Sequence, residues 1–151
     1  MKYTPLRLNV FTFFKLPSVW WCGVRVKKIE KSFCEATVVH RWINQNPFQS
    51  MFWAVQGMAA ELTTGVLIMQ AVQNSNKKVS MLVLNNRANF SKKARGKISF
   101  TCDGGDEITK ALKNLISSNE PQTLWLNSKG TDPQGDVVAS FEFEWTLLLK
   151  K

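Results

Sequence analysis

Residues 46–65, NPFQSMFWAVQGMAAELTTG, decide how this chain is organised. Between Arg41 and Lys77 the only charged residue is Glu61, and apolar residues fall on every side of a helical wheel. Such a helix is either buried or membrane-spanning. Polar residues interrupt the stretch at positions 49, 56, 61, 63, 64 and 70, and an acidic residue is costly in the middle of a membrane. We therefore expect a core helix and no membrane span.

The start of this helix is predicted from its capping residues. Asn46 is a good N-cap, Pro47 suits the first turn, and Gln49 stands three residues after Asn46, as a capping box requires. The prediction is a helix over residues 49–73, ended by the polar residues 74–76.

The flanking segments predict strands and two shorter helices. Thr4 as N-cap and Pro5 at the first helical position indicate a helix over residues 4–14, ending near Pro17. Alternating and β-branched residues predict a hairpin before the long helix, strands joined by a basic turn after it, and a closing hairpin. The predicted strands are 24–30, 34–40, 79–90, 97–102, 122–128 and 137–149, and helical spacing predicts a surface helix over 106–118.

Together these elements give an α+β protein in which antiparallel strands surround one long helix. A length of 151 residues suits one domain, 1–151, made of an N-terminal helical segment, 1–19, and a core, 20–148. Three cysteines without a CxxC pair and a single histidine, His40, argue against a disulfide framework and a metal site. His40 is expected to be structural or surface-exposed. The N-terminus lacks a clear cleavage site, so we expect a cytoplasmic protein.

The net charge of +9 is compatible with nucleic acid, anionic membranes or phosphorylated small molecules as partners. Basic residues form short groups, including Lys92, Lys93 and Arg95, and none forms a stripe along one helix. Nucleic-acid binding lacks a recognised motif here.

Glu61 is the strongest candidate for a catalytic residue in this helix. Burial raises the pKa of a carboxyl group, which suits a general acid or base. The alternative is that Glu61 accepts hydrogen bonds from Thr64 or a backbone amide, or faces solvent at a subunit boundary.

Residues 46–65 resemble the central-helix motif of hotdog-fold acyl-CoA thioesterases. In that motif an Asn leads, a His-Gly-Gly follows six residues later, and an Asp or Glu follows nine residues after the His. Asn46 matches the Asn and Glu61 the acid, whereas Phe52 stands in place of the His, and Trp53 and Ala54 replace the glycines. The chain is more closely similar to an uncharacterised hotdog family of the domain-of-unknown-function type, described as thioesterase-like. Residues 90–96 and 135–145 extend the resemblance, which covers about residues 20–148.

The resemblance implies a hotdog sheet wrapped around the helix and a site shared between the protomers of a homodimer or dimer of dimers. It implies thioester hydrolysis without a cofactor, with coenzyme A thioesters as substrates. The implied roles are Glu61 as general base or nucleophile, Asn46 positioning the carbonyl or the water, and Thr64 orienting the carboxylate. Backbone amides near Phe52 and Trp53 would polarise the carbonyl, and the coenzyme A phosphates would meet Lys92, Lys93 and Arg95. A non-catalytic acyl-CoA or lipid-binding protein is the alternative, because Phe52 and Trp53 are bulky.

Overall fold

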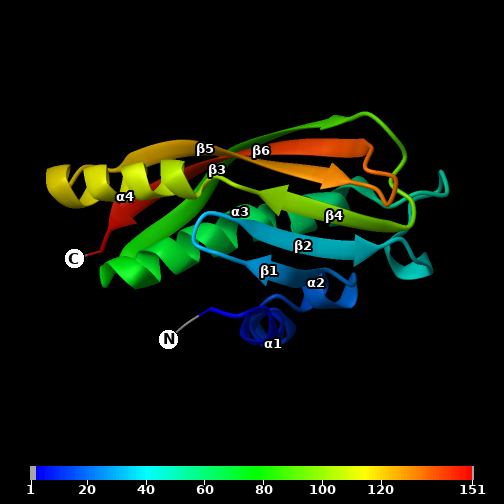
Figure 1. The fold of residues 1–151 in the computed structure, drawn as a ribbon, viewed down its shortest axis with the longest axis horizontal. Coiled ribbons are helices and arrows are strands. Elements are labelled where there is room, and N and C mark those ends of the chain that lie inside the picture. Colours follow the sequence, from blue (N-terminus) through cyan, green and yellow to red (C-terminus); the bar gives the residue numbers. More distant parts are fainter. Residues whose placement is uncertain (1–2, 151) are drawn as a thin grey trace.

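The computed structural model describes residues 3–150, which form one antiparallel sheet curved around a long helix (Figure 1). The six strands lie in the order β1-β2-β4-β5-β6-β3. In chain order their bounds are β1 Arg25–Ile29, β2 Cys34–Val39, β3 Val79–Phe90, β4 Lys97–Cys102, β5 Gln122–Thr131 and β6 Val137–Leu149. The helices are α1 Pro5–Lys15, α2 Pro17–Trp21, α3 Trp53–Ser75 and α4 Gly105–Ser118, with a short 3-10 turn, η1, at Trp42–Asn44.

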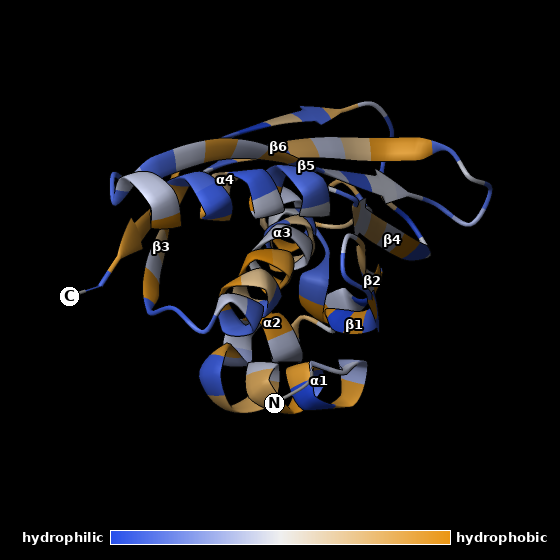
Figure 2. Ribbon diagram, turned by 60° about the vertical axis from the view of Figure 1, so that its left-hand side comes forward, coloured by the Kyte–Doolittle hydropathy of each residue, from blue (hydrophilic) through white to orange (hydrophobic). Residues whose placement is uncertain are grey.

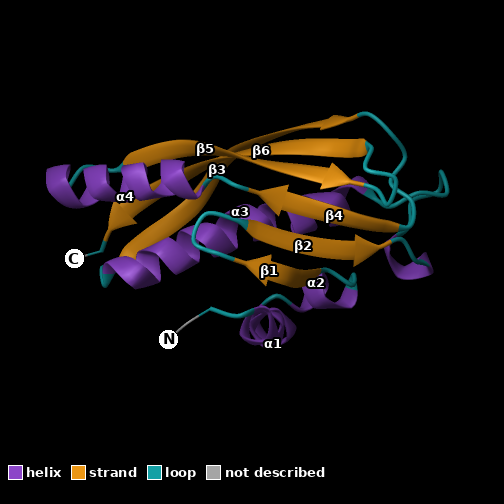
Figure 3. Cartoon of the chain, in the orientation of Figure 1, coloured by secondary structure: helices purple, strands orange, loops and turns teal. Residues whose placement is uncertain are grey.

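The central helix α3 packs its length against the concave face of the sheet (Figures 1 and 3). Small residues on α3 permit this close approach: the position of a Cβ at Gly65 lies 3.4 Å from the indole of Trp145 on β6. The hydroxyl groups of Thr63 and Ser128, both fully buried, lie 2.8 Å apart and join α3 to β5. The helix is therefore fixed by apolar packing and by paired buried polar groups.

The start of α3 differs from the sequence prediction. The helix begins at Trp53 with Phe52 as N-cap, so Asn46 is not its cap and Gln49 lies outside it. Gln49 has a φ of 58°, in the left-handed region, and the isolated bridge between Gln45 and Met51 closes residues 45–51 into a loop. The predicted capping box was wrong because the Asn46 side chain satisfies amides of its own loop instead of amides of the helix.

Other bounds are close to the predictions. The Thr4 hydroxyl accepts a hydrogen bond from the amide of Arg7 and caps α1, as expected. Pro17 ends that segment but also begins α2, which the sequence reading did not anticipate. The predicted strands 79–90 and 97–102 exist, yet they are not neighbours: β3 pairs with β6, whereas β4 lies between β2 and β5.

The two edge strands of the sheet, β1 and β3, differ in how far their backbone is covered. At β1, the side-chain amide of Asn9 on α1 donates to the carbonyl of Val26 and accepts from its amide, at 3.0 and 2.9 Å. The β3 edge has no neighbouring strand within residues 3–150, is 12 residues long and exposes Leu82 and Leu84. No helix in the described part of the chain is long and apolar enough to cross a membrane.

Candidate active site

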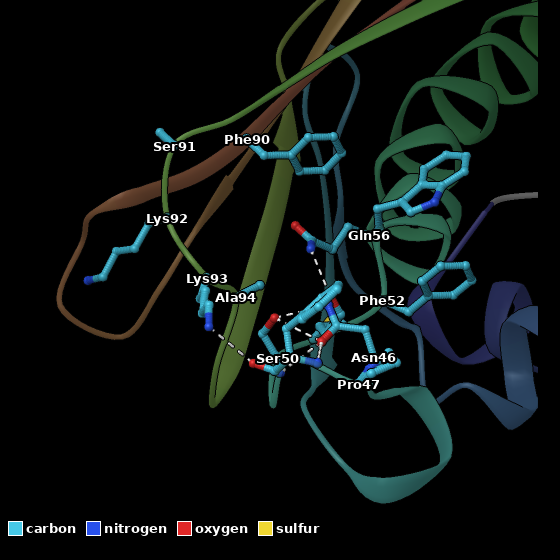
Figure 4. Close-up of a pocket in the computed structure, with 13 residues that line it drawn as sticks. Asn46, Pro47, Ser50, Phe52, Gln56, Phe90, Ser91, Lys92, Lys93 and Ala94 are labelled. Carbon is cyan, nitrogen blue, oxygen red and sulfur yellow. Dashed lines mark hydrogen bonds between the residues drawn. The ribbon is translucent and has the colours of Figure 1, made fainter.

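A cleft of about 630 Å³ opens beside the N-terminus of α3 (Figure 4). One wall comes from the loop 46–51, a second from the first turn of α3, and a third from Phe90 at the end of β3 and the residues 91–94 that follow it. The aromatic side chains at its mouth are all solvent-exposed: Phe48, Phe52, Trp53 and Phe90. The cleft therefore offers mainly apolar and aromatic surface, within the size range of small-molecule sites.

Asn46 organises the loop wall of this cleft. Its side-chain oxygen accepts from the amides of Phe48 and Ser50, at 2.9 and 3.2 Å, and its side-chain nitrogen donates to the hydroxyl of Ser50 and the carbonyl of Met51, at 3.0 and 3.3 Å. Both amide hydrogens of the side chain are thus used inside the loop. Asn46 shapes the site through the loop and has no donor left for a ligand.

The first turn of α3 provides the hydrogen-bond donors of the cleft. The amide of Phe52 donates to the carbonyl of Asn44 at 2.9 Å and is already paired. The amides of Trp53 and Ala54 make no hydrogen bond within residues 3–150, and no side chain caps this end of the helix. Free amides at a helix N-terminus carry partial positive charge, which favours an oxyanion. Of the two predicted donors, Trp53 is available and Phe52 is not.

Gln56, one turn into α3, is a cleft residue that the sequence analysis missed. Its side-chain nitrogen donates to the carbonyl of Met51 at 3.1 Å, whereas its buried Oε1 has no partner among the described residues. In Figure 4 this oxygen points from α3 toward the middle of the cleft. The available signal was a polar residue inside an apolar helix, one turn after Phe52.

The predicted coenzyme A contacts occupy two different environments. Lys92 donates to the carboxylates of Asp132 and Asp136, at 2.5 and 2.7 Å, so its charge is compensated twice. Hydrogen bonding to Lys92 holds the pKa of Asp132 below its ordinary value. Lys93 lines the cleft and donates to the carbonyl of Phe48 at 3.2 Å (Figure 4). Arg95 donates to the carbonyl of Gln49 at 2.9 Å and supports the loop from outside the cleft.

Glu61 lies on another face of α3, in a second cavity of about 170 Å³. The walls of this cavity are apolar and come from α1 and α2, from α3, and from Met81 and Trp145 on β3 and β6. The Glu61 side chain is still reached by solvent, but the surrounding atoms remove part of its hydration, and this desolvation raises its pKa. No hydrogen bond or ion pair holds its carboxylate within residues 3–150. The alternative expectation, that Thr64 or a backbone amide donates a hydrogen bond to the Glu61 carboxylate, is therefore not met in this structure.

Thr64 does not contact that carboxylate. Its hydroxyl donates to the backbone carbonyl of Glu61 at 2.9 Å and accepts from the indole Nε1 of Trp145 at 3.0 Å. Thr64 is fully buried on the side of α3 that faces the sheet. The resemblance implied that Thr64 orients the Glu61 carboxylate. In the structure its hydroxyl instead joins α3 to β6 through the indole of Trp145.

Within one chain, the structure gathers Asn46, Phe52, Trp53, Lys92 and Lys93 around the cleft and leaves Glu61 in the second cavity. His40 is half-buried just after β2, and its Nε2 has no partner among the described residues. No group of three or more histidine, cysteine or acidic side chains in residues 3–150 is placed to hold a metal ion.

Comparison with solved structures identifies the fold of this protein. A structure from Pseudomonas aeruginosa, described as a protein of unknown function and probable thioesterase, has a TM-score of 0.83 at 20% identity, over 97% of each chain. A protein of unknown function from Chlorobaculum tepidum has a TM-score of 0.82 at 15% identity, over 97% of this chain and 94% of that one. A thioesterase from Haemophilus influenzae has a TM-score of 0.74 at 12% identity, over 99% and 93%. The fold is therefore the predicted α+β hotdog fold.

The particular family follows from the sequence. The family described as a domain of unknown function, DUF4442, matches residues 6–147, and the chain belongs to it. This confirms the expected membership of a hotdog family of the domain-of-unknown-function type. No curated protein matches the chain in sequence.

Proposed function

We propose that this protein hydrolyses acyl-CoA thioesters. The observation that supports this most strongly is the uncapped start of α3, where the amides of Trp53 and Ala54 lack partners beside an aromatic cleft. Two such donors match the need of an acyl-transfer site to stabilise the oxyanion of a tetrahedral intermediate. Structural neighbours described as thioesterases fit the same chemistry.

In the proposed reaction, the thioester carbonyl oxygen accepts hydrogen bonds from the Trp53 and Ala54 amides. Glu61, ionised, takes a proton from a water molecule as the water oxygen attacks the carbonyl carbon. The tetrahedral intermediate then collapses, the carbon–sulfur bond breaks, and the proton returns to the departing coenzyme A sulfur. Desolvation raises the pKa of Glu61, which makes its carboxylate a stronger base. Direct attack by the carboxylate, forming an anhydride that water then opens, remains the second route.

The active unit in this proposal is a homodimer. Glu61 and the cleft lie in separate cavities of one chain, so a single chain does not join base and oxyanion donors. The long open edge of β3, with Leu82 and Leu84 exposed, is suited to pairing with the β3 of a second copy. Such pairing would bring Glu61 of one protomer toward the cleft of its partner. A dimer of dimers would bury further surface without changing this site.

Substrate binding in this proposal needs no cofactor. The cleft would take the pantetheine arm, and Gln56 Oε1, which lacks a partner, would accept a hydrogen bond from one of its amides. Lys93, at the cleft, is the favoured contact for phosphate, because Lys92 is compensated by two carboxylates and Arg95 is turned to the loop. Asn46 acts as a positioning residue through the loop.

A second candidate function is binding of acyl-CoA or a lipid without hydrolysis. The observation that favours it is the bulk at the start of α3, where the exposed rings of Phe52 and Trp53 contact each other edge to face, with centroids 5.9 Å apart. Both rings line the cleft beside the amide donors, and their bulk would hinder the approach of a carbonyl.

A panel of acyl-CoAs of different chain length, assayed for release of free thiol, tests the proposal. We expect hydrolysis by the wild type and a loss of about 10²–10⁴-fold in Glu61→Gln. Glu120→Gln, at an exposed position beyond α4, is the matched control and should keep full activity. Binding of a panel member by the wild type without thiol release would support the second candidate and contradict the first.

A further inference from the structure

The outer face of α1 is apolar where a surface helix is expected to be polar. Leu6, Val10, Phe13 and Phe14 follow the spacing i, i+4, i+7 and i+8, so they form one stripe, and all four are solvent-exposed. The opposite face of the helix already makes the contacts with the protein body, through buried Leu8 and Thr12 and through Asn9 on the edge of β1. The exposed stripe is therefore a second apolar face without a partner within residues 3–150.

Aromatic residues of α2 continue this surface. The ring of Phe13 contacts the rings of Phe14 and Trp20 edge to face, with centroids 4.9 and 5.3 Å apart. Trp21, the last residue of α2, is 67% exposed, comparable with Phe14 at 71% and Leu6 at 75%. We call Leu6, Val10, Phe13, Phe14 and Trp21 the N-terminal apolar face. Figure 2 places α1 at the outer border of the molecule, below the edge strand β1.

The charge around the N-terminal apolar face is mainly positive; the nearest acidic groups are Glu30 and the Glu61 carboxylate in the cavity that the same segment lines. Between Tyr3 and Phe33 the only acidic residue is Glu30, which pairs with Lys28 at 2.9 Å. Exposed cationic side chains lie on α1 and on the neighbouring strand β1 and its turn: Arg7, Lys15, Lys27, Lys28 and Lys31. The Arg25 guanidinium stacks over the ring of Trp20, 3.5 Å from its centroid. Exposed aromatic and aliphatic side chains beside cationic ones are what an interfacial helix presents to anionic lipid.

A second copy of this chain is a poorer occupant for this face. In a two-fold symmetric dimer the same patch lies on both sides of the interface. The cationic side chains around the apolar face of one protomer would then lie opposite those of the other and repel them. An anionic surface has the opposite sign, and the open edge of β3 already offers a route to self-association.

We propose that the N-terminal apolar face docks the protein on the surface of an anionic lipid bilayer. The side chains of Phe14 and Trp21 enter the headgroup region, and the lysines of α1 and β1 contact the lipid phosphates and carboxylates. The same segment also lines the Glu61 cavity with Phe11, Leu16 and Val19, so docking places that cavity next to the lipid. The proposal does not depend on thioester hydrolysis, because it concerns binding alone.

Flotation of the full chain with phosphatidylcholine vesicles, with and without phosphatidylserine, tests this proposal. We expect the wild type to float with vesicles that contain phosphatidylserine, to float less with phosphatidylcholine alone, and to be released as salt increases. The double variant Phe14→Ser, Trp21→Ser should lose affinity by about tenfold or more, because less apolar surface enters the bilayer. Trp125→Ser, on the outward face of β5, removes an exposed tryptophan elsewhere and should bind as the wild type does.

Three results would overturn the proposal. The first is equal flotation of the wild type and the double variant, and the second is no flotation of the wild type with phosphatidylserine. The third is a change in the mass of the double variant by light scattering, which would identify the face as a contact between subunits. Circular dichroism melting of each variant verifies that it is folded, and the salt dependence of wild-type flotation is a readout that needs no variant.

Discussion

The cleft at the start of α3 and the cavity around Glu61 lie on different faces of one helix and are built in opposite ways. In the cleft, Asn46, Ser50 and Met51 form a closed network of hydrogen bonds, and the amides that remain free belong to the backbone. In the Glu61 cavity the walls are apolar and the carboxylate has no described partner. One region supplies rigid donors and the other a basic oxygen with a raised pKa. A hydrolytic site needs both, and one chain keeps them apart.

The largest effect we expect comes from removing a donor on the cleft side. Phe52, which precedes Trp53, has φ −61° and ψ 136°, and this extended conformation suits a residue before proline. Trp53→Pro therefore removes one amide hydrogen at the first helical position without breaking α3. We expect kcat to fall by about 10²–10³-fold relative to Trp53→Ala, which loses the same indole but keeps the amide. Equal rates for the two variants would remove this amide from the mechanism.

Mixing two inactive variants tests whether the two regions meet across subunits. Trp53→Pro damages the cleft and Glu61→Gln damages the acid, so a mixed dimer would contain one site with both changes and one site with neither. After subunit exchange of equal amounts, we expect about one quarter of wild-type activity, from random pairing in a two-fold dimer. Activity that stays at the level of the separate variants, although exchange is verified by mass, would place base and donors in the same chain.

A smaller effect, on stability, should follow from Thr64→Val. This change keeps the shape of the side chain and leaves the buried indole Nε1–H of Trp145 without its acceptor. We expect a loss of about 1–3 kcal/mol in the free energy of unfolding, measured by urea denaturation, with unchanged activity for each folded molecule. Thr64→Ser retains the hydroxyl and is the control. A large fall in kcat with unchanged stability would instead support orientation of the Glu61 carboxylate by Thr64.

The smallest effect concerns the pH dependence of stability. Because desolvation raises the pKa of Glu61, the folded protein binds more protons than the unfolded chain between the two pKa values. The contribution of Glu61 to stability is therefore complete below about pH 4.3, the ordinary value for Glu, and is lost as pH rises through the folded pKa. Glu61→Gln removes this loss, so its melting temperature at pH 8 should equal or exceed that of the wild type. A melting temperature several degrees lower would show that the carboxylate stabilises the fold.

The sequence by itself determined the α+β plan, because its signals are local or periodic, and the resemblance of residues 46–65 implied the hotdog fold. An apolar helix with one charged residue has to be covered by a sheet, and the alternation along residues 137–149 marks a strand with one buried face. The bounds of β3, β4 and β6 agree with the predicted ranges for the same reason. Glu61 stands out as the lone charged residue of an apolar helix and Asn46 as a predicted helix cap, and the resemblance implied their roles; the structure gives them different surroundings.

Only the tertiary structure decided which groups have free hydrogen-bonding capacity. Asn46 reads as a helix cap in sequence, but the bridge between Gln45 and Met51 turns its side chain into the loop. Thr64 stands one turn from Glu61, yet Trp145, distant in sequence, uses its hydroxyl. Lys92 reads as a free cation until Asp132 and Asp136 are brought to it across the fold. For Thr64 and Lys92 the partners lie many residues away, and for Asn46 the bridge that closes the loop decides which nearby amides it meets; local sequence pattern records neither.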